Sequence, residues 1–229
     1  MGLGSYWHEI IDVLRAIIPV YDKVNHAISL GKDVVYREHG INGRVKRGNL
    51  ILDAGSGYGN MSKVALRQCD ENVRIVMLDP MPEMLAKAKI EFDRSSVLIS
   101  GIFEYLPFKE KMFDAVMCGY SLRDAISLRT AISEMHRVLK DGGRLIIVDI
   151  GKPDNAFNRI GVSFYLRYIL GILAFFSAGS LGLKFRAIYG TYKRLPSNNE
   201  LDKMLKEKFT KVEFEERMMG GAIIVAAYK

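Results

Sequence analysis

The sequence predicts one α/β domain with a doubly wound, seven-stranded and mostly parallel sheet that ends in an antiparallel hairpin. Between residues 49 and 150, five short apolar runs alternate with helical segments. Such runs are typical of parallel strands that are covered on both faces. Two further runs, KVEFEERMM and GAIIVAAYK, meet at Gly220 and Gly221. This link is too short for a parallel crossover, so the two runs should pair antiparallel.

Length and composition are consistent with a single domain over residues 1–229. A chain of 229 residues with 49% hydrophobic residues can bury one sizeable core. Its net charge of +7 favours acidic partners, which include nucleic acid, an anionic membrane surface and an anionic substrate. Cys69 and Cys118 form neither a disulfide framework nor a metal-ligand cluster, which favours a reducing cytoplasm. Residues 1–20 lack the features of a signal peptide.

The first forty-five residues are expected to form a helical cap over residues 5–45. Apolar side chains recur at helical spacing from Trp7 to Ile18, with Glu9, Asp12 and Arg15 on the opposite side. Pro19 should end that helix. A second helical stretch over residues 21–40 then leads to a polar turn at residues 46–48.

The alternating region that follows supplies the core of the sheet. Strands are expected over residues 49–53, 73–79, 96–100, 113–118 and 144–150, with helices over residues 60–68, 82–92 and 126–139. An insertion at about residues 155–195 contains an uncharged run, residues 168–183, which is shorter than the ~20 residues that span a bilayer. It is a buried core or lid helix, a face dipping into a membrane interface, or the wall of a lipid pocket.

A glycine-rich loop follows the first strand directly. The sequence Asp53-Ala54-Gly55-Ser56-Gly57-Tyr58-Gly59 allows a tight turn and close backbone approach to a ligand. A dinucleotide fingerprint would need glycine where Asn60 stands, whereas an acidic residue before the first glycine is typical of methyltransferases. The loop and the terminal hairpin therefore favour S-adenosylmethionine (SAM) over a nicotinamide dinucleotide.

An acidic residue ends the second strand about twenty residues after the loop. The carboxylate of Asp79 can accept hydrogen bonds from both hydroxyls of a ribose. The alternative for Asp79 is a turn or helix N-cap before Pro80. Ligands of open α/β sheets bind at the carboxyl ends of strands, so cofactor contacts are expected from these residues: Asp53, Gly55, Ser56, Gly57, Tyr58, Asp79, Pro80, Met81, Ile102, Phe103, Cys118 and Gly119.

Two of these expectations have competing interpretations. Ile102 and Phe103 would sandwich the adenine, but ordinary core packing explains them as well. Cys118 closes a strand and is not expected to act as a nucleophile, because no base lies near it in the sequence.

Several segments together resemble one family of methyltransferases, over residues 19–229. They are Tyr21-Asp22-Lys23-Val24-Asn25 with Ser29, LDAGSGYG, LPF at residues 106–108, FDAV, SLRD at residues 121–124, HRVLKDGGRLIIVD, and Arg186 with Pro196. They resemble the UbiE-type C-methyltransferases of ubiquinone and menaquinone biosynthesis. The resemblance implies SAM as cofactor, S-adenosylhomocysteine as product, no metal, and cofactor contacts from Tyr58, Asp79, Ile102, Phe103 and Gly119. It also implies that Tyr21 caps the site; packing of the N-terminal helices is the alternative.

The acceptor implied by the resemblance is a lipophilic prenylated benzoquinol or naphthoquinol. Several positions depart from the family pattern, which puts the acceptor in question: Asp33, Tyr36, Ile102, Asp124, Asp149 and Gly151. The alternatives are another small or lipid-like acceptor such as a phospholipid amine or a sterol-like ring, an RNA methyltransferase, and a SAM-binding protein without catalysis. No RNA-binding module or amino-methylation motif is present in the sequence, so nucleic acid is not expected as a partner.

The SLRD segment supplies the expected catalytic residues. Arg123 would stabilise the phenolate of the acceptor, because a guanidinium stays protonated in proteins. Asp124 would orient Arg123 or accept the proton, and an Arg–Asp pair that only orders the loop is the alternative. The insertion suits an isoprenoid tail, and Lys184, Arg186, Lys193 and Arg194 follow its apolar run. The enzyme is therefore expected in the cytoplasm, with transient contact to an anionic membrane surface. A homodimer is compatible with the sequence.

Overall fold

A seven-stranded sheet forms the centre of the computed structural model, which describes residue 2 and residues 4–92 and 96–229. Its strands are β1 (Leu50–Ala54), β2 (Arg74–Asp79), β3 (Ser96–Ser100), β4 (Phe113–Gly119), β5 (Leu139–Ile150), β6 (Lys211–Arg217) and β7 (Ala222–Tyr228). They lie in the order β3-β2-β1-β4-β5-β7-β6. Strands β1 to β5 are parallel to one another, and β7 is antiparallel to both β5 and β6. This confirms the predicted sheet and its terminal hairpin.

Two strand boundaries differ from the sequence prediction. Strand β5 begins at Leu139 instead of residue 144, because Leu139 already pairs with Phe113 before the register shifts in a bulge. Strand β6 ends at Arg217, two residues early, because Met218 and Met219 both adopt positive φ in the turn that leads to β7. Local irregularities of this kind carry no hydrophobic period, so pattern analysis places such ends poorly.

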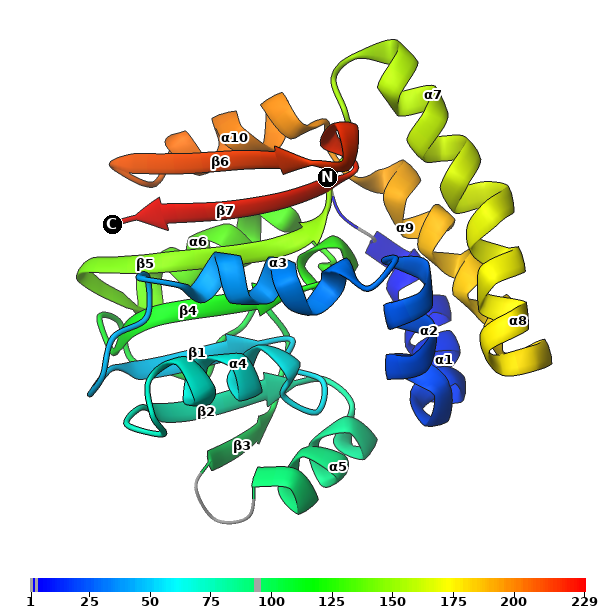
Figure 1. The fold of residues 1–229 in the computed structure, drawn as a ribbon. Coiled ribbons are helices and arrows are strands. Elements are labelled where there is room, and N and C mark those ends of the chain that lie inside the picture. Colours follow the sequence, from blue (N-terminus) through cyan, green and yellow to red (C-terminus); the bar gives the residue numbers. More distant parts are fainter. Residues whose placement is uncertain (1, 3, 93–95) are drawn as a thin grey trace.

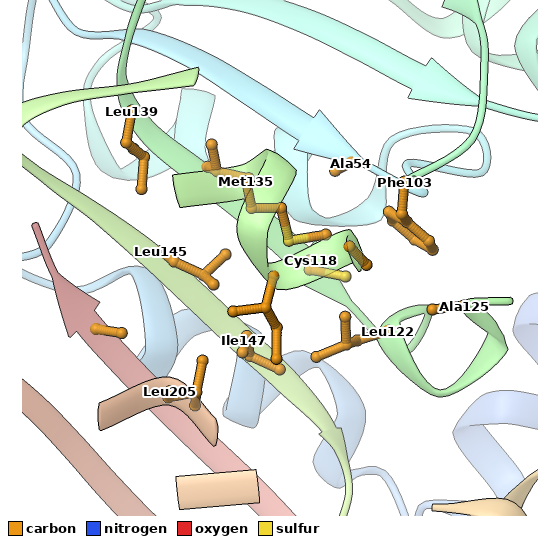
Figure 2. Packing of buried hydrophobic residues seen from close by; sticks show 14 of the residues in the cluster. Ala54, Phe103, Cys118, Leu122, Ala125, Met135, Leu139, Leu145, Ile147 and Leu205 are labelled. Carbon is orange, nitrogen blue, oxygen red and sulfur yellow. The ribbon is translucent and has the colours of Figure 1, made fainter. Parts of the chain in front are cut away.

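Helices cover both faces of the sheet, as a doubly wound fold requires (Figure 1). One face carries α3 (Lys32–Ile41), α4 (Asn60–Gln68) and α5 (Pro82–Phe92), and the other carries α6 (Leu128–Val138) and α10 (Asn198–Lys206). Figure 2 shows the second of these cores, where Met135 of α6 and Leu205 of α10 pack against the strands.

The sequence analysis does not anticipate helix α10. The sequence nevertheless contains a start signal for this helix, because Ser197 and Glu200 form a capping box. The Ser197 hydroxyl accepts a hydrogen bond from the Glu200 amide, and the Glu200 carboxylate accepts one from the Ser197 amide. This S-x-x-E spacing before an apolar pattern is a recognised mark of a helix start.

The remaining helices gather beyond the carboxyl ends of the parallel strands (Figure 1). They are α1 (Trp7–Ile17), α2 (Tyr21–Ile28), α7 (Ala156–Phe164), the π-helical η4 (Tyr165–Ile169), α8 (Leu170–Gly182), the 3-10 turn η5 (Leu183–Arg186) and α9 (Ala187–Arg194). Side chains of the N-terminal segment and of the insertion share one buried cluster, which includes Val24 of α2 and Leu170 of α8. The two segments therefore form a single helical layer above one end of the sheet.

Candidate active site

A cleft with an empty volume of about 890 Å³ opens at the carboxyl ends of β1, β2 and β4. The strand order reverses between β1 and β4, which is where open α/β sheets bind their ligands. Most of the residues predicted from sequence line this one cleft: Tyr21, Asp53, Gly55, Ser56, Gly57, Tyr58, Asp79, Pro80, Met81, Ile102, Phe103, Gly119 and Asp124.

The glycine loop forms the floor of the cleft. Gly55 has a φ of 65°, a conformation that L side chains rarely adopt. A Cβ atom at this position would lie 2.6 Å from both the Phe103 ring and the Ser121 hydroxyl. The loop therefore packs against the ends of the neighbouring strands with no room for a side chain, which holds its backbone in one shape.

Asp79 points into the cleft from the end of β2. Its Oδ2 accepts a 2.8 Å hydrogen bond from the Gly57 amide, and its Oδ1 accepts a 2.9 Å bond from the Met81 amide. Burial raises the pKa of Asp79 to about 6 despite these two bonds. The bond to Met81 is the turn contact that the alternative interpretation expects, so this carboxylate shapes the turn. Each oxygen keeps a lone pair that can face a ribose hydroxyl.

Asp53 is buried beneath the glycine loop. Its Oδ2 accepts hydrogen bonds from the Ser62 hydroxyl at 2.6 Å and from the Ser62 amide at 3.1 Å. Its Oδ1 has no hydrogen-bond partner within the described part of the chain, and the side chain lines the cleft. Burial raises the pKa of Asp53 to about 6. This oxygen is an acceptor held in place for a donor that the protein itself does not supply.

Arg37 is a cleft residue that the sequence analysis missed. It lies on α3, is 4% exposed, and donates from Nη1 to Asp33 Oδ2 at 2.9 Å. Its guanidinium lies 4.7 Å from the centre of the Tyr120 ring, and its Nε has no hydrogen-bond partner among the described residues. A Cβ on Gly119 would lie 3.8 Å from that Nε, which places it beside the end of β4. The available signal was Asp33 four residues before Arg37, an i,i+4 ion pair on one helix face.

These groups fit the parts of SAM. The free Oδ1 of Asp53 and the free Nε of Arg37 lie on the same cleft and match the ammonium and carboxylate groups of the methionine end. Asp79 matches the ribose, and the partly buried Ile102 with the buried Phe103 offers an apolar surface for the adenine. The residues present are therefore suited to this cofactor.

Tyr21 and Tyr58 lie edge to face, with ring centres 6.1 Å apart. Tyr58 is 1% exposed and carries the Lys87 ammonium 3.7 Å above its ring centre. Tyr21 also contacts Phe185 of η5, with ring centres 6.1 Å apart. Tyr21 thus packs the helical layer onto the sheet and lines the cleft at the same time, so both interpretations of this residue have a structural basis.

Cys118 does not reach the cleft. Its side chain is fully buried and lies among Leu122, Met135 and Ile147 in the core below α6 (Figure 2). Its Sγ lies 3.2 Å from the Ser121 hydroxyl, and burial raises the pKa of its thiol. Of the predicted cofactor residues, it alone has a side chain outside the cleft lining of the described chain.

Arg123 and Asp124 occupy the short 3-10 turn η3 (Leu122–Asp124) after β4. The Arg123 guanidinium donates to Asp149 Oδ1 at 3.0 Å and to the Tyr120 carbonyl, while its Nε lies 3.7 Å from Asp124 Oδ1. Burial alone would lower the pKa of Arg123, but the carboxylates of Asp124 and Asp149 raise it above its ordinary value. Burial raises the pKa of Asp124 to about 6, against the effect of Arg123.

A second pocket lies beside the cleft and has an empty volume of about 1060 Å³. The two cavities share Arg37 and Tyr120. Arg123 lines this second pocket and not the cleft, whereas Asp124 lines the cleft. The other lining residues come from α2 and the turn after it, α3, the end of β5, the insertion, the β6–β7 turn and the start of β7: Asn25, Ile28, Ser29, Leu30, Asp33, Tyr36, Ile150, Gly161, Val162, Tyr165, Leu166, Leu170, Ile188, Met218, Met219, Gly221 and Ala222.

The π-helical turn η4 forms a wall of this pocket. It places Tyr165 and Leu166 in the lining, and the Tyr165 hydroxyl donates to the Ile28 carbonyl at 2.5 Å. That bond ties the insertion to the N-terminal helices. Within the described chain, no group of three or more His, Cys, Asp or Glu side chains is arranged to hold a metal ion.

Comparison with known proteins agrees with this geometry. Residues 5–229 match the model of the ubiE/COQ5 methyltransferase family. A ubiquinone/menaquinone biosynthesis C-methyltransferase UbiE from Geobacter sulfurreducens is 30% identical over 83% of this chain and 73% of its own. A demethylmenaquinone methyltransferase from Oceanobacillus iheyensis is 28% identical over 100% and 99% of the two chains. The crystal structure of a SAM-dependent methyltransferase from Aquifex aeolicus shares the fold, with a TM-score of 0.61 at 15% identity over 90% and 97%.

Proposed function

Because the chain belongs to the ubiE/COQ5 methyltransferase family and is a SAM-dependent methyltransferase, we propose that it methylates a ring carbon of a prenylated benzoquinol or naphthoquinol. Two relatives support this proposal by name, a ubiquinone/menaquinone biosynthesis C-methyltransferase and a demethylmenaquinone methyltransferase. The observation that carries the proposal is the second pocket, which meets the cofactor cleft at Arg37 and Tyr120 and contains a fixed, buried guanidinium. We call it the acceptor pocket.

The acceptor pocket suits a ring that carries an apolar tail. Its lining is largely aliphatic and aromatic, and the exposed side chains of Leu30 and Met219 mark its opening to solvent. Each buried CH₂ group of a tail contributes about 0.8 kcal/mol, so a few isoprenoid units would supply most of the binding free energy. The ring would then lie at the opposite end, against the wall that the two cavities share.

Arg123 is suited to stabilise the acceptor as its phenolate. SAM supplies a methyl group on a sulfonium, and an in-line displacement needs the attacking carbon about 3 Å from that methyl. Loss of the hydroxyl proton would make the ortho ring carbon electron-rich, and the new C–C bond would form as the S–CH₃ bond breaks. The ring C–H proton would then pass to water, which restores the aromatic ring as its phenolate. Arg123 is held by Asp149 and Tyr120, and its Nε has no hydrogen-bond partner in the described chain. It is a fixed donor for an oxyanion.

Asp124 is the candidate to receive the proton of the acceptor's hydroxyl group. It lines the cleft beside Arg123, and burial raises its pKa to about 6. A phenol has a pKa of ~10, so direct transfer to this carboxylate costs about 5 kcal/mol before any electrostatic help. The positive charge of Arg123 lowers that cost by stabilising the phenolate. The two residues therefore act together, with Arg123 as the clamp and Asp124 as the base.

The pair of arginines argues against an amine as acceptor. Arg37 and Arg123 are both buried at the acceptor pocket, and Asp33, the only acidic residue in its lining among the described residues, is already paired with Arg37. No free carboxylate of the described residues therefore faces this pocket to bind an ammonium group of a phospholipid. Cys69 and Cys118 are free, buried thiols, in keeping with a reducing compartment such as the cytoplasm.

The test is methyl transfer from labelled SAM to four acceptors: a prenylated demethyl-naphthoquinol, a prenylated benzoquinol, phosphatidylethanolamine and a sterol. We expect incorporation into a prenylated quinol and none into the last two. Arg123→Lys should lower kcat by about 100-fold or more while the Kd for SAM stays within twofold, which also shows that the variant is folded. Incorporation only into phosphatidylethanolamine or the sterol, or SAM binding without transfer to either quinol, would overturn the proposal.

A further inference from the structure

An exposed apolar stripe runs along the outer side of α7, η4 and α8. Its members are Phe157, Ile160, Phe164, Tyr168, Ile172, Phe175 and Phe176, which are between 46% and 87% exposed. Apart from the adjacent Phe175 and Phe176, they recur every three or four residues, so they share one side of the helix over about 29 Å. Soluble proteins rarely leave so many large apolar side chains contiguous and exposed. The stripe therefore indicates a surface that something apolar covers.

The same helix faces the acceptor pocket with its other side. Gly161, Val162 and Tyr165 line the pocket, and they alternate along the chain with Ile160 and Phe164 of the stripe. The exposed Leu30 and Met219 mark the opening of that pocket. One helix thus has the acceptor pocket on one side and the apolar stripe on the other.

All charged side chains of the segment that contains the stripe are positive. From Asn155 to Asn199 the sequence contains six cations and no acidic residue, so the segment carries +6 of the chain's net +7. The cations are Arg159, Arg167, Lys184, Arg186, Lys193 and Arg194. None of them forms a salt bridge with any residue that the structure describes. An apolar stripe, in a segment whose cations form no salt bridges with the described residues, matches a surface with an apolar interior and anionic head groups.

By length and composition, the helical segment Ala156–Arg194 could cross a bilayer, and only 22% of its most apolar stretch is buried. Its structure argues instead for a position in the plane of the interface. The backbone leaves helical geometry at Ala178 and Gly179, where φ is −145° and 60°. The chain then folds back, since a Cβ on Gly182 would overlap the Ala174 carbonyl. The buried Leu166 and Leu170 also hold one side of the helix against the protein, away from lipid.

We propose that the outer side of α7, η4 and α8 docks on the surface of an anionic phospholipid bilayer. The stripe would insert among the acyl chains close to the head groups, and cations of the same segment would contact phosphate groups. Docking would bring the opening of the acceptor pocket close to the membrane. The inference does not depend on which acceptor is methylated, because binding to lipid is measured without substrate.

The experiment is flotation of the full chain with vesicles of phosphatidylcholine alone and of phosphatidylcholine with 30% phosphatidylglycerol. We expect binding to the anionic vesicles, at least tenfold weaker binding to the neutral ones, and a loss at 0.5 M NaCl. The variant Phe157→Ser/Phe164→Ser/Phe176→Ser should lose at least tenfold in affinity. The matched control Ile90→Ser, at an 85% exposed position of α5, should bind like the wild type.

Further measurements distinguish membrane docking from self-association of the chain. Sedimentation velocity without vesicles reports whether the stripe joins two copies of the chain instead. Absence of binding to anionic vesicles, or binding that the triple substitution leaves unchanged, would overturn the proposal. A dimer that the triple substitution dissociates, with no vesicle binding, would assign the stripe to self-association. SAM binding by each variant shows that it is folded.

Discussion

The cofactor cleft and the acceptor pocket share a wall at Arg37 and Tyr120, yet they are built in different ways. The cleft is made of loops at the ends of neighbouring strands, and its carboxylates are oriented by hydrogen bonds with backbone amides, as Asp79 is by Gly57 and Met81. The acceptor pocket lies between helices of two distant segments, and few of its groups are polar.

The contrast is between directional polar binding and burial of apolar surface. A lost polar partner leaves a buried group unsatisfied, which is costly, whereas an apolar wall responds in proportion to the area that changes. Substitutions in the cleft should therefore have large effects on SAM binding. Those in the acceptor pocket should have graded effects that are confined to the acceptor.

The largest effect is expected for Asp79→Ala. Removing two charge-assisted hydrogen bonds to the ribose should weaken SAM binding by about 10²–10⁴-fold, measured by isothermal titration. Asp79→Asn, which keeps the shape of the side chain, should lose less. An unchanged Kd in a folded Asp79→Ala protein would mean that the cleft does not bind the cofactor in this way.

Arg37→Met tests the role of the arginine at the wall that the cofactor cleft and the acceptor pocket share. If Arg37 binds the carboxylate of SAM, its loss should raise the Kd by roughly 10- to 100-fold. Arg37→Lys should recover part of this affinity, because the charge is kept while the fixed geometry of the guanidinium is lost. A raised KM for the acceptor with an unchanged Kd for SAM would assign Arg37 to the acceptor side.

The pH dependence of SAM binding should also arise from groups in the cleft. Burial raises the pKa values of Asp53 and Asp79 to about 6, above the value of 3.8 expected in the unfolded chain. SAM binding needs the ionised forms, so affinity should fall about tenfold for each group between pH 7 and pH 5. The Asp79→Asn variant should show a smaller change in its Kd for SAM over this pH range than the wild type does. A Kd that is flat over this range would contradict the assignment.

The same two groups predict the opposite trend for stability without cofactor. Between pH 4 and pH 6 the folded state binds more protons at Asp53 and Asp79 than the unfolded state does. The free energy of unfolding from these groups therefore falls as pH rises through that window. Urea unfolding at pH 5 and pH 7 measures this contribution, and replacing both residues by Asn should remove it.

The smallest effect is expected in the acceptor pocket. Val162→Phe narrows the pocket and should raise KM about five- to tenfold for a long-tailed quinol, with little change for an acceptor that lacks the tail. SAM binding should stay within twofold of the wild type. Val97→Phe, at a 56% exposed position of β3, is the matched control. Equal losses for long-tailed and tail-free acceptors would show that the tail does not occupy this pocket.

The cleft was largely predictable because its signals are local. A strand, a glycine loop and an acidic strand end follow one another within thirty residues, and parallel strands bring their carboxyl ends to the same edge of the sheet. Cys118 shows the limit of this reasoning. It lies at the correct strand end, but the alternation of a strand turns its side chain into the core below α6.

The acceptor pocket was not predictable in the same way. The insertion was recognised as a region that suits an apolar tail. Nothing in the sequence, however, predicts that Tyr165 of the insertion contacts Ile28, or that Arg123 after β4 contacts Asp149 of β5. These contacts join residues that lie far apart in the chain. The sequence analysis left open whether the apolar run of the insertion is buried or exposed, because an apolar helix has the same sequence pattern in both cases.

The sequence by itself determined the sheet, the glycine loop, the acidic strand ends and the family, because hydrophobic period and turn chemistry act over a few residues. Only the tertiary structure decided that Arg37 reaches the cofactor cleft, that Arg123 lies on the acceptor side, and that one side of the insertion stays exposed. The physical reason is that packing between helices depends on the shape of distant surfaces, which no local pattern encodes.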